Sequence, residues 1–273
     1  MLGLEKQEYP KISTLPTKKQ LANGVQGKVL VITGATTGIG AAIARGSLEA
    51  GATSVYNLDL KEPSNSQADE FASLQEEYPN QAHYLFGDVT KLETLKKAFR
   101  TIVSNEGRID GVVANAGITK RKGSLEYTEE EWDSIIAVNL KGVINTCMVA
   151  INIFLSLKKT GSIVITASLV AHGTNKAAPA LPYQATKSAL RGVVRGLASE
   201  FGPQGIRVNS ISPGYVNTAL TQYKLDDKFP IWGGMPRMAE PREIAGTYVY
   251  LLSDAASYTS GEDIRVHGSV DAW

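Results

Sequence analysis

Three side chains in the second half of the chain could together move a proton at a hydroxyl or carbonyl group. Tyr183 and Lys187 are four residues apart in the sequence YQATK, so on a helix they would share one face. A phenol with a pKa of about 10 is a poor base at neutral pH, but a neighbouring ammonium favours the phenolate. Ser168 ends an apolar run fifteen residues before Tyr183, where its hydroxyl could bond the same substrate oxygen. A lone YxxxK is most simply a surface helix, whereas the combination with Ser168 predicts general acid/base chemistry on an alcohol or ketone.

A glycine-rich turn in the first fifth of the chain has the context of a nucleotide site. The sequence VLVIT-GATTGIG-AAIA is typical of a strand, a turn and the start of a helix. Its glycines would allow a tight turn and let the backbone approach a pyrophosphate, which the helix N-terminus would stabilise. The spacing is GxxxGxG rather than the commoner GxGxxG, and a turn that serves only packing is the alternative. The turn residues expected at a dinucleotide are Gly34, Thr36, Thr37, Gly38, Ile39 and Gly40.

Asp59, at the end of the second apolar run, predicts which dinucleotide is bound. A carboxylate here can accept both ribose hydroxyls of NAD and would repel the 2′-phosphate of NADP. Thr37 stands where a basic residue could otherwise meet that phosphate. NAD is therefore the predicted cofactor, and NADP is the less favoured alternative. Two other interpretations stay open: Asp59 could cap the following segment, or the strand could end one residue later, close to Lys61.

The ends of the next two apolar runs would complete the nucleotide site. The third run closes with Asp88 and Val89, which would meet the adenine ring. The fourth closes with ANAG, whose small residues would let the chain pass close to the ribose. The residues expected at the cofactor beyond the glycine turn are Asp59, Leu60, Asp88, Val89, Asn115, Ala116 and Gly117.

The elements that must position these residues are short Val- and Ile-rich runs that alternate with longer amphipathic segments. The runs lie at 29–33, 54–60, 82–89, 109–117, 161–168, 206–214 and 263–266. Segments with a helical period lie at 38–50, 91–105, 129–157 and 183–201. Thr128 and Glu131 have the spacing of a capping box before the third of these segments. The pattern predicts an α/β fold of the Rossmann type, a doubly wound parallel sheet of about seven strands with helices on both faces.

The domain organisation follows from the same pattern. Residues 1–26 are polar and show no sustained period, so they are expected to form an N-terminal arm. Residues 27–273 are expected to form a single NAD(P)-binding Rossmann domain that includes the active site and a substrate loop.

Composition and charge exclude several classes of function. The net charge is +1 with a pI of about 7.7, which provides no field suited to nucleic acid or an anionic membrane. No apolar stretch is long enough to span a bilayer, and the charged N-terminus is unlike a secretory signal, so a cytoplasmic protein is expected. Cys147 is the only cysteine and the three histidines are far apart, which predicts no metal site and excludes a zinc-dependent alcohol dehydrogenase.

With these motifs in place, the sequence resembles the short-chain dehydrogenase/reductase family, in the compact branch with TGxxxGIG and YxxxK. The likeness spans residues 26–268 and includes TGATTGIG, ANAG, VNLKG, GSIVITAS, YQATK and ISPGYVNT. It implies hydride transfer between a nicotinamide cofactor and a small-molecule secondary alcohol or ketone. The alternative is a catalytically silent NAD-binding regulatory or interaction protein of the same fold. Such proteins typically lose the Tyr or the Lys, and both are present here.

The resemblance also implies residue roles. Tyr183 would be the general acid/base, and Ser168 would hold and polarise the substrate oxygen. Lys187 would bind the nicotinamide ribose and lower the pKa of Tyr183, while Asn139 of VNLKG would hold a water that relays protons to Lys187. The residues implied around the nicotinamide are Pro213, Gly214, Val216 and Thr218.

Within the family, VITASLVAHG, the Ser–Tyr spacing and ISPGYVNT are most similar to the fungal mannitol dehydrogenase and sorbose or xylulose reductase group. The implied substrate is a polyol/ketose pair or a cyclic ketone of secondary metabolism. The chain departs from this group at Asp59 and Thr37, where NADP features are usual, and in VHGS near the C-terminus. The loop at 220–235 is also more aromatic than a polyol pocket needs. Its aromatic residues are Tyr223, Phe229 and Trp232.

A homo-oligomer is expected from two of the helical segments. The segment at 129–157 has a broad apolar face, and the one at 183–201 carries the small Gly192 and Gly196, which would let a partner helix approach closely. The resemblance implies pairing of these two helices in a two-fold four-helix bundle, with a tetramer favoured over a dimer. The alternative is that both faces belong to the intramolecular core.

Overall fold

The computed structural model describes residues 24–62, 70–173, 179–221, 234–235 and 237–270. Seven strands form one sheet in the order β3-β2-β1-β4-β5-β6-β7, and every adjacent pair is parallel. The strands are β1 (Val29–Thr33), β2 (Ser54–Asp59), β3 (Ala82–Phe86), β4 (Gly111–Ala114), β5 (Gly161–Thr166), β6 (Ile206–Pro213) and β7 (Asp263–Val266). The predicted doubly wound parallel sheet is confirmed.

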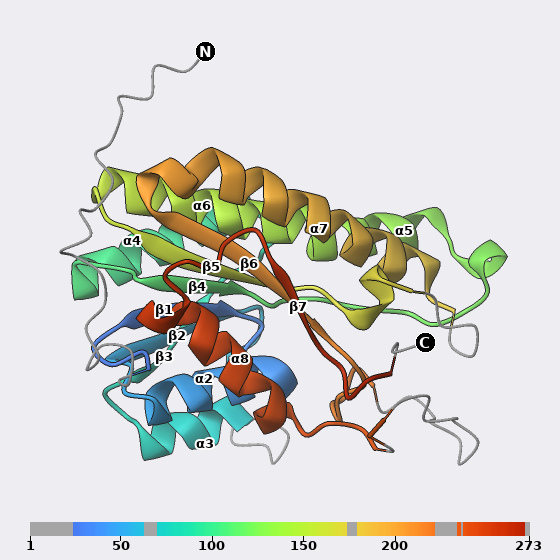
Figure 1. Cartoon of the computed structure of the whole chain (residues 1–273), viewed down its shortest axis with the longest axis horizontal. Coiled ribbons are helices and arrows are strands. Elements are labelled where there is room, and N and C mark those ends of the chain that lie inside the picture. The colour runs from blue at the N-terminus through green and yellow to red at the C-terminus, as the bar shows by residue number, and fades with distance from the viewer. Residues whose placement is uncertain (1–23, 63–69, 174–178, 222–233, 236, 271–273) are drawn as a thin grey trace.

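Helices cover both faces of the sheet, and each face has its own apolar core (Figure 1). On one face lie α4 (Leu92–Glu106), α5 (Glu129–Ile136), α6 (Val143–Ser156) and α7 (Leu181–Phe201). On the other lie α2 (Gly38–Glu49), α3 (Glu70–Glu77) and α8 (Pro241–Leu252). β1 lies between β2 and β4, so the strand order reverses at its carboxyl end. Ligands of open α/β sheets bind in the crevice at such a reversal.

The predicted helix at 129–157 is not a single regular α-helix. The capping box of Thr128 and Glu131 is confirmed, but a π-helical turn at Ala137–Gly142 separates α5 from α6. Inside this turn Asn139 is fully buried, and its side chain binds the N–H and the C=O of Ile118, each at 2.8 Å. A π turn holds an extra residue, and such turns are frequent at functional sites. The periodicity of apolar residues could not reveal the π turn, because the hydrogen bonds of Asn139 are made to Ile118, in a separate segment of the chain.

Two helices, α3 and α8, were not among the predicted helical segments. α3 is short and buries only Phe71 and Leu74 along its length, so it has little helical period. α8 begins at Pro241 with a capping box of Glu240 and Glu243, a signal that is visible in the sequence. The third and fourth strands also end earlier than predicted, because the residues that follow them leave the sheet and line a cavity.

The boundary of the predicted N-terminal arm needs a small correction. Most of the arm lies outside the described residues. Its last residues belong to the folded part, because Val25 is fully buried in the core under α2 and α8, and the N–H of Gly27 donates to Gly51 at 2.9 Å. Burial of Val25 requires the turn at its position, which a polar composition does not predict.

The continuous helical stretch Glu129–Ser156 is long and apolar enough to cross a membrane by length and composition alone. Half of its most apolar window is buried inside the protein, as in the core helix of a soluble protein. The stretch is therefore weak support for a membrane span, and the absence of one stays a prediction.

Candidate active site

A cavity of about 630 Å³ lies at the carboxyl ends of the strands. It brings together the ends of β1, β2, β4, β5 and β6 with the start of α2 and one turn of α7. Every predicted site residue lines it except Thr36 and Asn139. The predicted residues that line it are Gly34, Thr37, Gly38, Ile39, Gly40, Asp59, Leu60, Asp88, Val89, Asn115, Ala116, Gly117, Ser168, Tyr183, Lys187, Pro213, Gly214, Val216 and Thr218.

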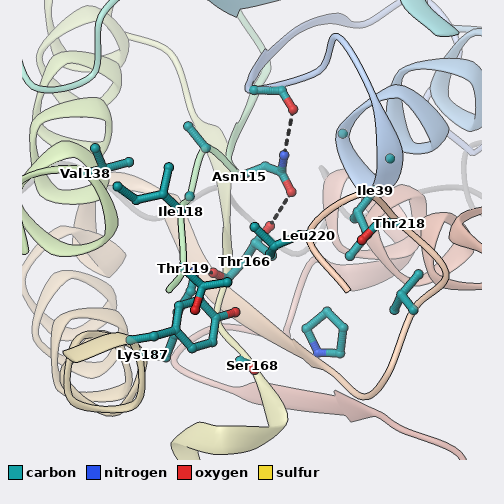
Figure 2. A pocket seen from close by; sticks show the side chains of 18 of the residues that line it. Ile39, Asn115, Ile118, Thr119, Val138, Thr166, Ser168, Lys187, Thr218 and Leu220 are labelled. Atoms are coloured by element: carbon teal, nitrogen blue, oxygen red, sulfur yellow. Dashed lines mark hydrogen bonds between the residues drawn. The ribbon is translucent and has the colours of Figure 1, made fainter. Parts of the chain in front are cut away.

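The three residues with acid/base potential meet at one end of this cavity. α7 carries Tyr183 and Lys187 one turn apart, and the Lys187 ammonium lies 5.6 Å from the centre of the Tyr183 ring. Lys187 is 2% exposed and donates to the carbonyl of Thr166 at 2.6 Å. Ser168 follows β5 and hydrogen-bonds Tyr183. Figure 2 shows Thr166, Ser168 and Lys187 on one side of the pocket, opposite Ile39 and Thr218.

Burial has the largest effect on the pKa of both Tyr183 and Lys187. Burial lowers the pKa of Lys187 to about 8. Burial also raises the pKa of Tyr183, while the hydrogen bond with Ser168 and the positive charge of Arg121 lower it. Lys187 is not among these causes, so the lowering of the Tyr183 pKa by Lys187 stays a prediction.

At the other end, backbone rather than side chains shapes the cavity. Gly34 and Gly38 have φ values of +69° and +62°, which side-chain-bearing residues rarely adopt. A Cβ on Gly40 would lie 2.2 Å from the carbonyl oxygen of Gly34, and one on Gly34 would lie 2.9 Å from the Cα of Ala116. Thr37 at the N-cap of α2 makes no side-chain capping bond, so its hydroxyl does not cover the helix N-terminus. These residues fit a dinucleotide, whose pyrophosphate would lie against this turn.

Asp59 is the last residue of β2 and pairs in register with Phe86 of β3, which settles the open question of where the strand ends. Its carboxylate accepts hydrogen bonds from the hydroxyl of Thr36 at 2.7 Å and from the N–H of Leu60 at 2.7 Å. Thr36 also accepts from Asn57 at 3.1 Å. Thr36 thus holds the Asp59 carboxylate in place, and its predicted contact with the cofactor stays a prediction.

Two asparagines have structural roles that their motifs did not indicate. Asn115 links neighbouring strands, because its amide donates to Gly34 at 2.9 Å and its oxygen accepts from Thr166 at 3.1 Å. Asn139 does not line the cavity; a Cβ on Gly117 would lie 3.4 Å from the Asn139 oxygen and 3.7 Å from the Lys187 nitrogen. Asn139 therefore lies behind Gly117 and close to Lys187, while its predicted role of holding a water stays a prediction.

Sequence reasoning missed several residues that line the chemical end. Arg121 lies in the segment between ANAG and α5, and Tyr215 directly follows the predicted Pro213–Gly214 pair. The sequence offered one signal for both residues, which is that each lies shortly after a recognised motif. The predicted aromatic residues Tyr223, Phe229 and Trp232 fall outside the described part of the chain. Other lining residues that were not predicted include Thr90, Ile118, Thr119, Val138, Thr166, Ala167, Leu169, Val170, Ala180, Ala219, Leu220 and Thr221.

Comparison with known proteins agrees with this geometry. A family model described as enoyl-(acyl carrier protein) reductase matches residues 34–270. The chain is 34% identical over 253 residues to the NADP-dependent mannitol dehydrogenase of Alternaria alternata, which covers 89% of this chain and 92% of the relative. It is 36% identical over 250 residues to a sorbose reductase of Schizosaccharomyces pombe, with 89% and 96% covered.

Among solved structures, the NADPH-dependent 3-quinuclidinone reductase from Rhodotorula rubra matches with a TM-score of 0.86 at 27% identity. The match covers 99% of this chain and 100% of that one. Because the similarity in sequence extends over most of this chain and over nearly the whole of both relatives, the chain belongs to the short-chain dehydrogenase/reductase family of nicotinamide-dependent oxidoreductases.

Proposed function

We propose that this oxidoreductase of secondary alcohols and ketones uses NAD and acts on a polyol/ketose pair or a cyclic ketone. The proposal is based on the observation that Ser168, Tyr183 and Lys187 line the same cavity as the glycine turn. The proteins compared above support the substrate class, since they are described as a mannitol dehydrogenase, a sorbose reductase and a quinuclidinone reductase.

Each residue at the chemical end has its own role in the proposed reaction. In the direction of reduction, Tyr183 donates its phenolic proton to the substrate oxygen, and Ser168 donates a hydrogen bond to the same oxygen. Lys187, buried beside the Tyr183 ring and bonded to Thr166, orients the site and favours the phenolate left after transfer. Asn139 holds a water beside Lys187. The nicotinamide, when bound, supplies or accepts the hydride.

NAD is the cofactor that the charges of the nucleotide end favour. Asp59 lines the cavity there, and the carboxylate of Glu70 accepts from the N–H of Gly38 at 3.3 Å, which adds a second negative charge beside the turn. Among the described lining residues, the cations are Arg121 and Lys187, and both lie near Tyr183. Among the described residues that line this end of the cavity, a 2′-phosphate would therefore meet carboxylates rather than cations. The NADP named for two of the compared proteins is the competing outcome.

Turnover by the purified full-length chain tests the reaction and its cofactor together. The panel contains mannitol, sorbitol, fructose, sorbose and 3-quinuclidinone, each offered with NAD(H) and with NADP(H). We expect turnover of at least one of these compounds, with NAD(H) preferred. Protein that binds NAD but turns over no member of the panel with either cofactor would favour the silent binding protein.

A symmetric homo-oligomer, with a tetramer favoured over a dimer, completes the proposal. Gly192 and Gly196 on α7 have open space where a Cβ would stand, which supports close approach by a partner helix. Ile136 of α5 and Met148 of α6 are 40% and 38% exposed, so apolar surface is available beside them. Light scattering at micromolar concentration tests this, and a mass near the 29.3 kDa of one chain would refute it.

We place the protein in the cytoplasm, with no nucleic acid or membrane partner, which cell fractionation can check.

A further inference from the structure

The chemical end of the cavity contains a cation that the proposed acid/base mechanism does not use. Arg121 lines the cavity together with Tyr183 and Tyr215. Its two neighbours in the chain are neutralised, because Lys120 and Lys122 both form ion pairs with Glu131, the first at 3.0 Å. Within the part of the chain that the structure describes, no carboxylate forms an ion pair with Arg121.

The segment that carries Arg121 is held in place on both sides. Asn139 binds both backbone groups of Ile118 at 2.8 Å. The hydroxyl of Tyr127 donates to the carbonyl of Lys120 at 2.6 Å, and the Lys122 ammonium lies 5.1 Å from the centre of the Tyr127 ring. Figure 2 shows Ile118 on the same side of the pocket as Lys187. Arg121 is therefore presented to the cavity by an anchored segment.

The charge of Arg121 reaches the reacting group. Burial raises the pKa of Tyr183 and of Tyr215, and the positive charge of Arg121 opposes both rises, so the guanidinium is within electrostatic range of both hydroxyls. The acidic lining residues, Asp59 and Asp88, are at the opposite, nucleotide end. An anion that enters the chemical end thus meets a cation there and is separated from the carboxylates.

We propose that Arg121 binds an anionic group of the substrate, a carboxylate or a phosphate, while the carbonyl of the same molecule meets Tyr183. A guanidinium is weakly hydrated and presents forked N–H donors that match the oxygens of both anions. The substrate class becomes a ketone that carries an acid group, such as a keto sugar acid or a ketose phosphate. This inference rests on the proposed oxidoreductase function.

Two matched pairs of compounds test the inference by binding, without any need for turnover. L-Sorbose and 5-keto-D-gluconate differ in a terminal hydroxymethyl against a carboxylate, and D-fructose and D-fructose 6-phosphate differ in a hydroxyl against a phosphate. Calorimetric titration uses the full-length chain saturated with NADH in a Tyr183→Phe background, so that no reaction occurs. We expect the anionic member of one pair to bind roughly 10- to 100-fold more tightly than its neutral partner. The pair that responds identifies the anion.

Substitution of Arg121 then identifies the residue responsible. Arg121→Gln should abolish the preference within the pair, and Arg121→Lys should keep part of it because the charge remains. Arg100→Gln is the matched control, since it removes an exposed arginine from α4 outside the cavity. The inference would be overturned if, in the protein with Arg121 intact, the two members of each pair bound equally tightly. It would also be overturned if no compound bound. An Arg121→Gln variant that weakens anionic and neutral members equally would overturn it as well, because that pattern indicates an effect on the site as a whole.

The same variants with Tyr183 intact separate this inference from the proposed function. An anion preference in binding with no turnover of any compound would overturn the oxidoreductase assignment and leave the anion site standing. Turnover of a neutral ketone with a kcat/KM that exceeds that of its anionic partner, and that Arg121→Gln does not change, would overturn the anion site alone. If Arg121 acted only by lowering the pKa of Tyr183, the pH profile would shift equally for both members of a pair, which would also overturn it.

Discussion

The nucleotide end and the chemical end of the cavity are built in opposite ways. At the nucleotide end the backbone shapes the surface, and the two carboxylates that line it are already hydrogen-bonded, Asp59 by Thr36 and Leu60 and Asp88 by Thr90. At the chemical end the surface consists of side chains from separate elements. The nucleotide end is acidic and the chemical end is basic, so one cavity presents opposite charges to the two ligands that a dehydrogenase must bind together.

The difference has a physical consequence for how each end tolerates change. A backbone surface fails when a Cβ is added, because the neighbouring carbonyl cannot move far. A side-chain surface fails when a charge or a proton is removed, because the remaining groups are buried without their partner. Each end of the cavity can therefore be disturbed separately.

Tyr183→Phe should abolish the reaction while leaving the nucleotide end intact. Loss of an acid/base group commonly lowers the rate by roughly 10²–10⁴-fold. The affinity for NAD should stay within a few-fold, because the glycine turn and Asp59 are far along the cavity from the phenol. Steady-state kinetics and NAD titration measure the two effects. A variant that keeps more than half of kcat would rule out this assignment of the acid/base.

Lys187→Met should change the pH dependence of stability. The folded pKa of Lys187 is about 8 against 10.5 for the free side chain, so the unfolded state binds more protons between these values. The free energy of unfolding of the wild type should therefore rise, relative to the variant, by about 3 kcal/mol as pH increases from 8 to 10.5. Below pH 8 the cost of the buried charge is fully present.

Urea unfolding at several pH values across this window measures the difference between the two proteins. Lys97→Met, which removes an exposed lysine from α4, corrects for the loss of one charge. A wild-type curve that runs parallel to the Lys187→Met curve would show that Lys187 is not buried as a strained cation.

Asp59→Ser should change the cofactor choice without affecting the chemical end. If the Asp59 carboxylate binds the ribose diol, the wild type should prefer NAD by at least about 10-fold, as a charge-assisted contact of roughly 1.5–3 kcal/mol implies. The variant should lose most of that preference. Values of kcat/KM for NAD and NADP provide the measurement. Glu70→Gln tests the contribution of the Glu70 carboxylate, which accepts from the N–H of Gly38. Equal or better use of NADP by the wild type would refute the NAD assignment.

Gly40→Ala tests the backbone surface of the nucleotide end, and its control is Gly246→Ala, at a helical glycine with open space around it. The new Cβ would lie 2.2 Å from the Gly34 carbonyl oxygen, so we expect a loss of about 1–3 kcal/mol in stability together with weakened NAD binding. Gly246→Ala on α8 meets nothing within 4 Å and should stabilise the protein by about 0.5–1 kcal/mol. Thermal unfolding with and without NAD compares them. A Gly40→Ala variant with wild-type stability and NAD affinity would show that the turn has more freedom than its contacts indicate.

The sheet, the glycine turn and the acid/base set could be predicted from the order of the amino acids, because each depends on local pattern. Apolar runs predict buried parallel strands, and a spacing of four places Tyr183 and Lys187 on one face of α7. Residues at strand ends, such as Asp59 and Ser168, come together because parallel strands all end at one edge of the sheet.

How these residues are supported and charged depends on contacts that form only when the chain folds. Thr36 belongs to the glycine turn but lies behind Asp59, and Asn139 holds the segment that leads to Arg121 through a π-helical turn. The three adjacent cations of KRK could not be told apart until Glu131 was seen to pair with the outer two. The pKa of Tyr183 likewise depends on its burial and on neighbours from other elements. These properties depend on contacts between segments far apart in the chain, which local periodicity and motif spacing do not encode.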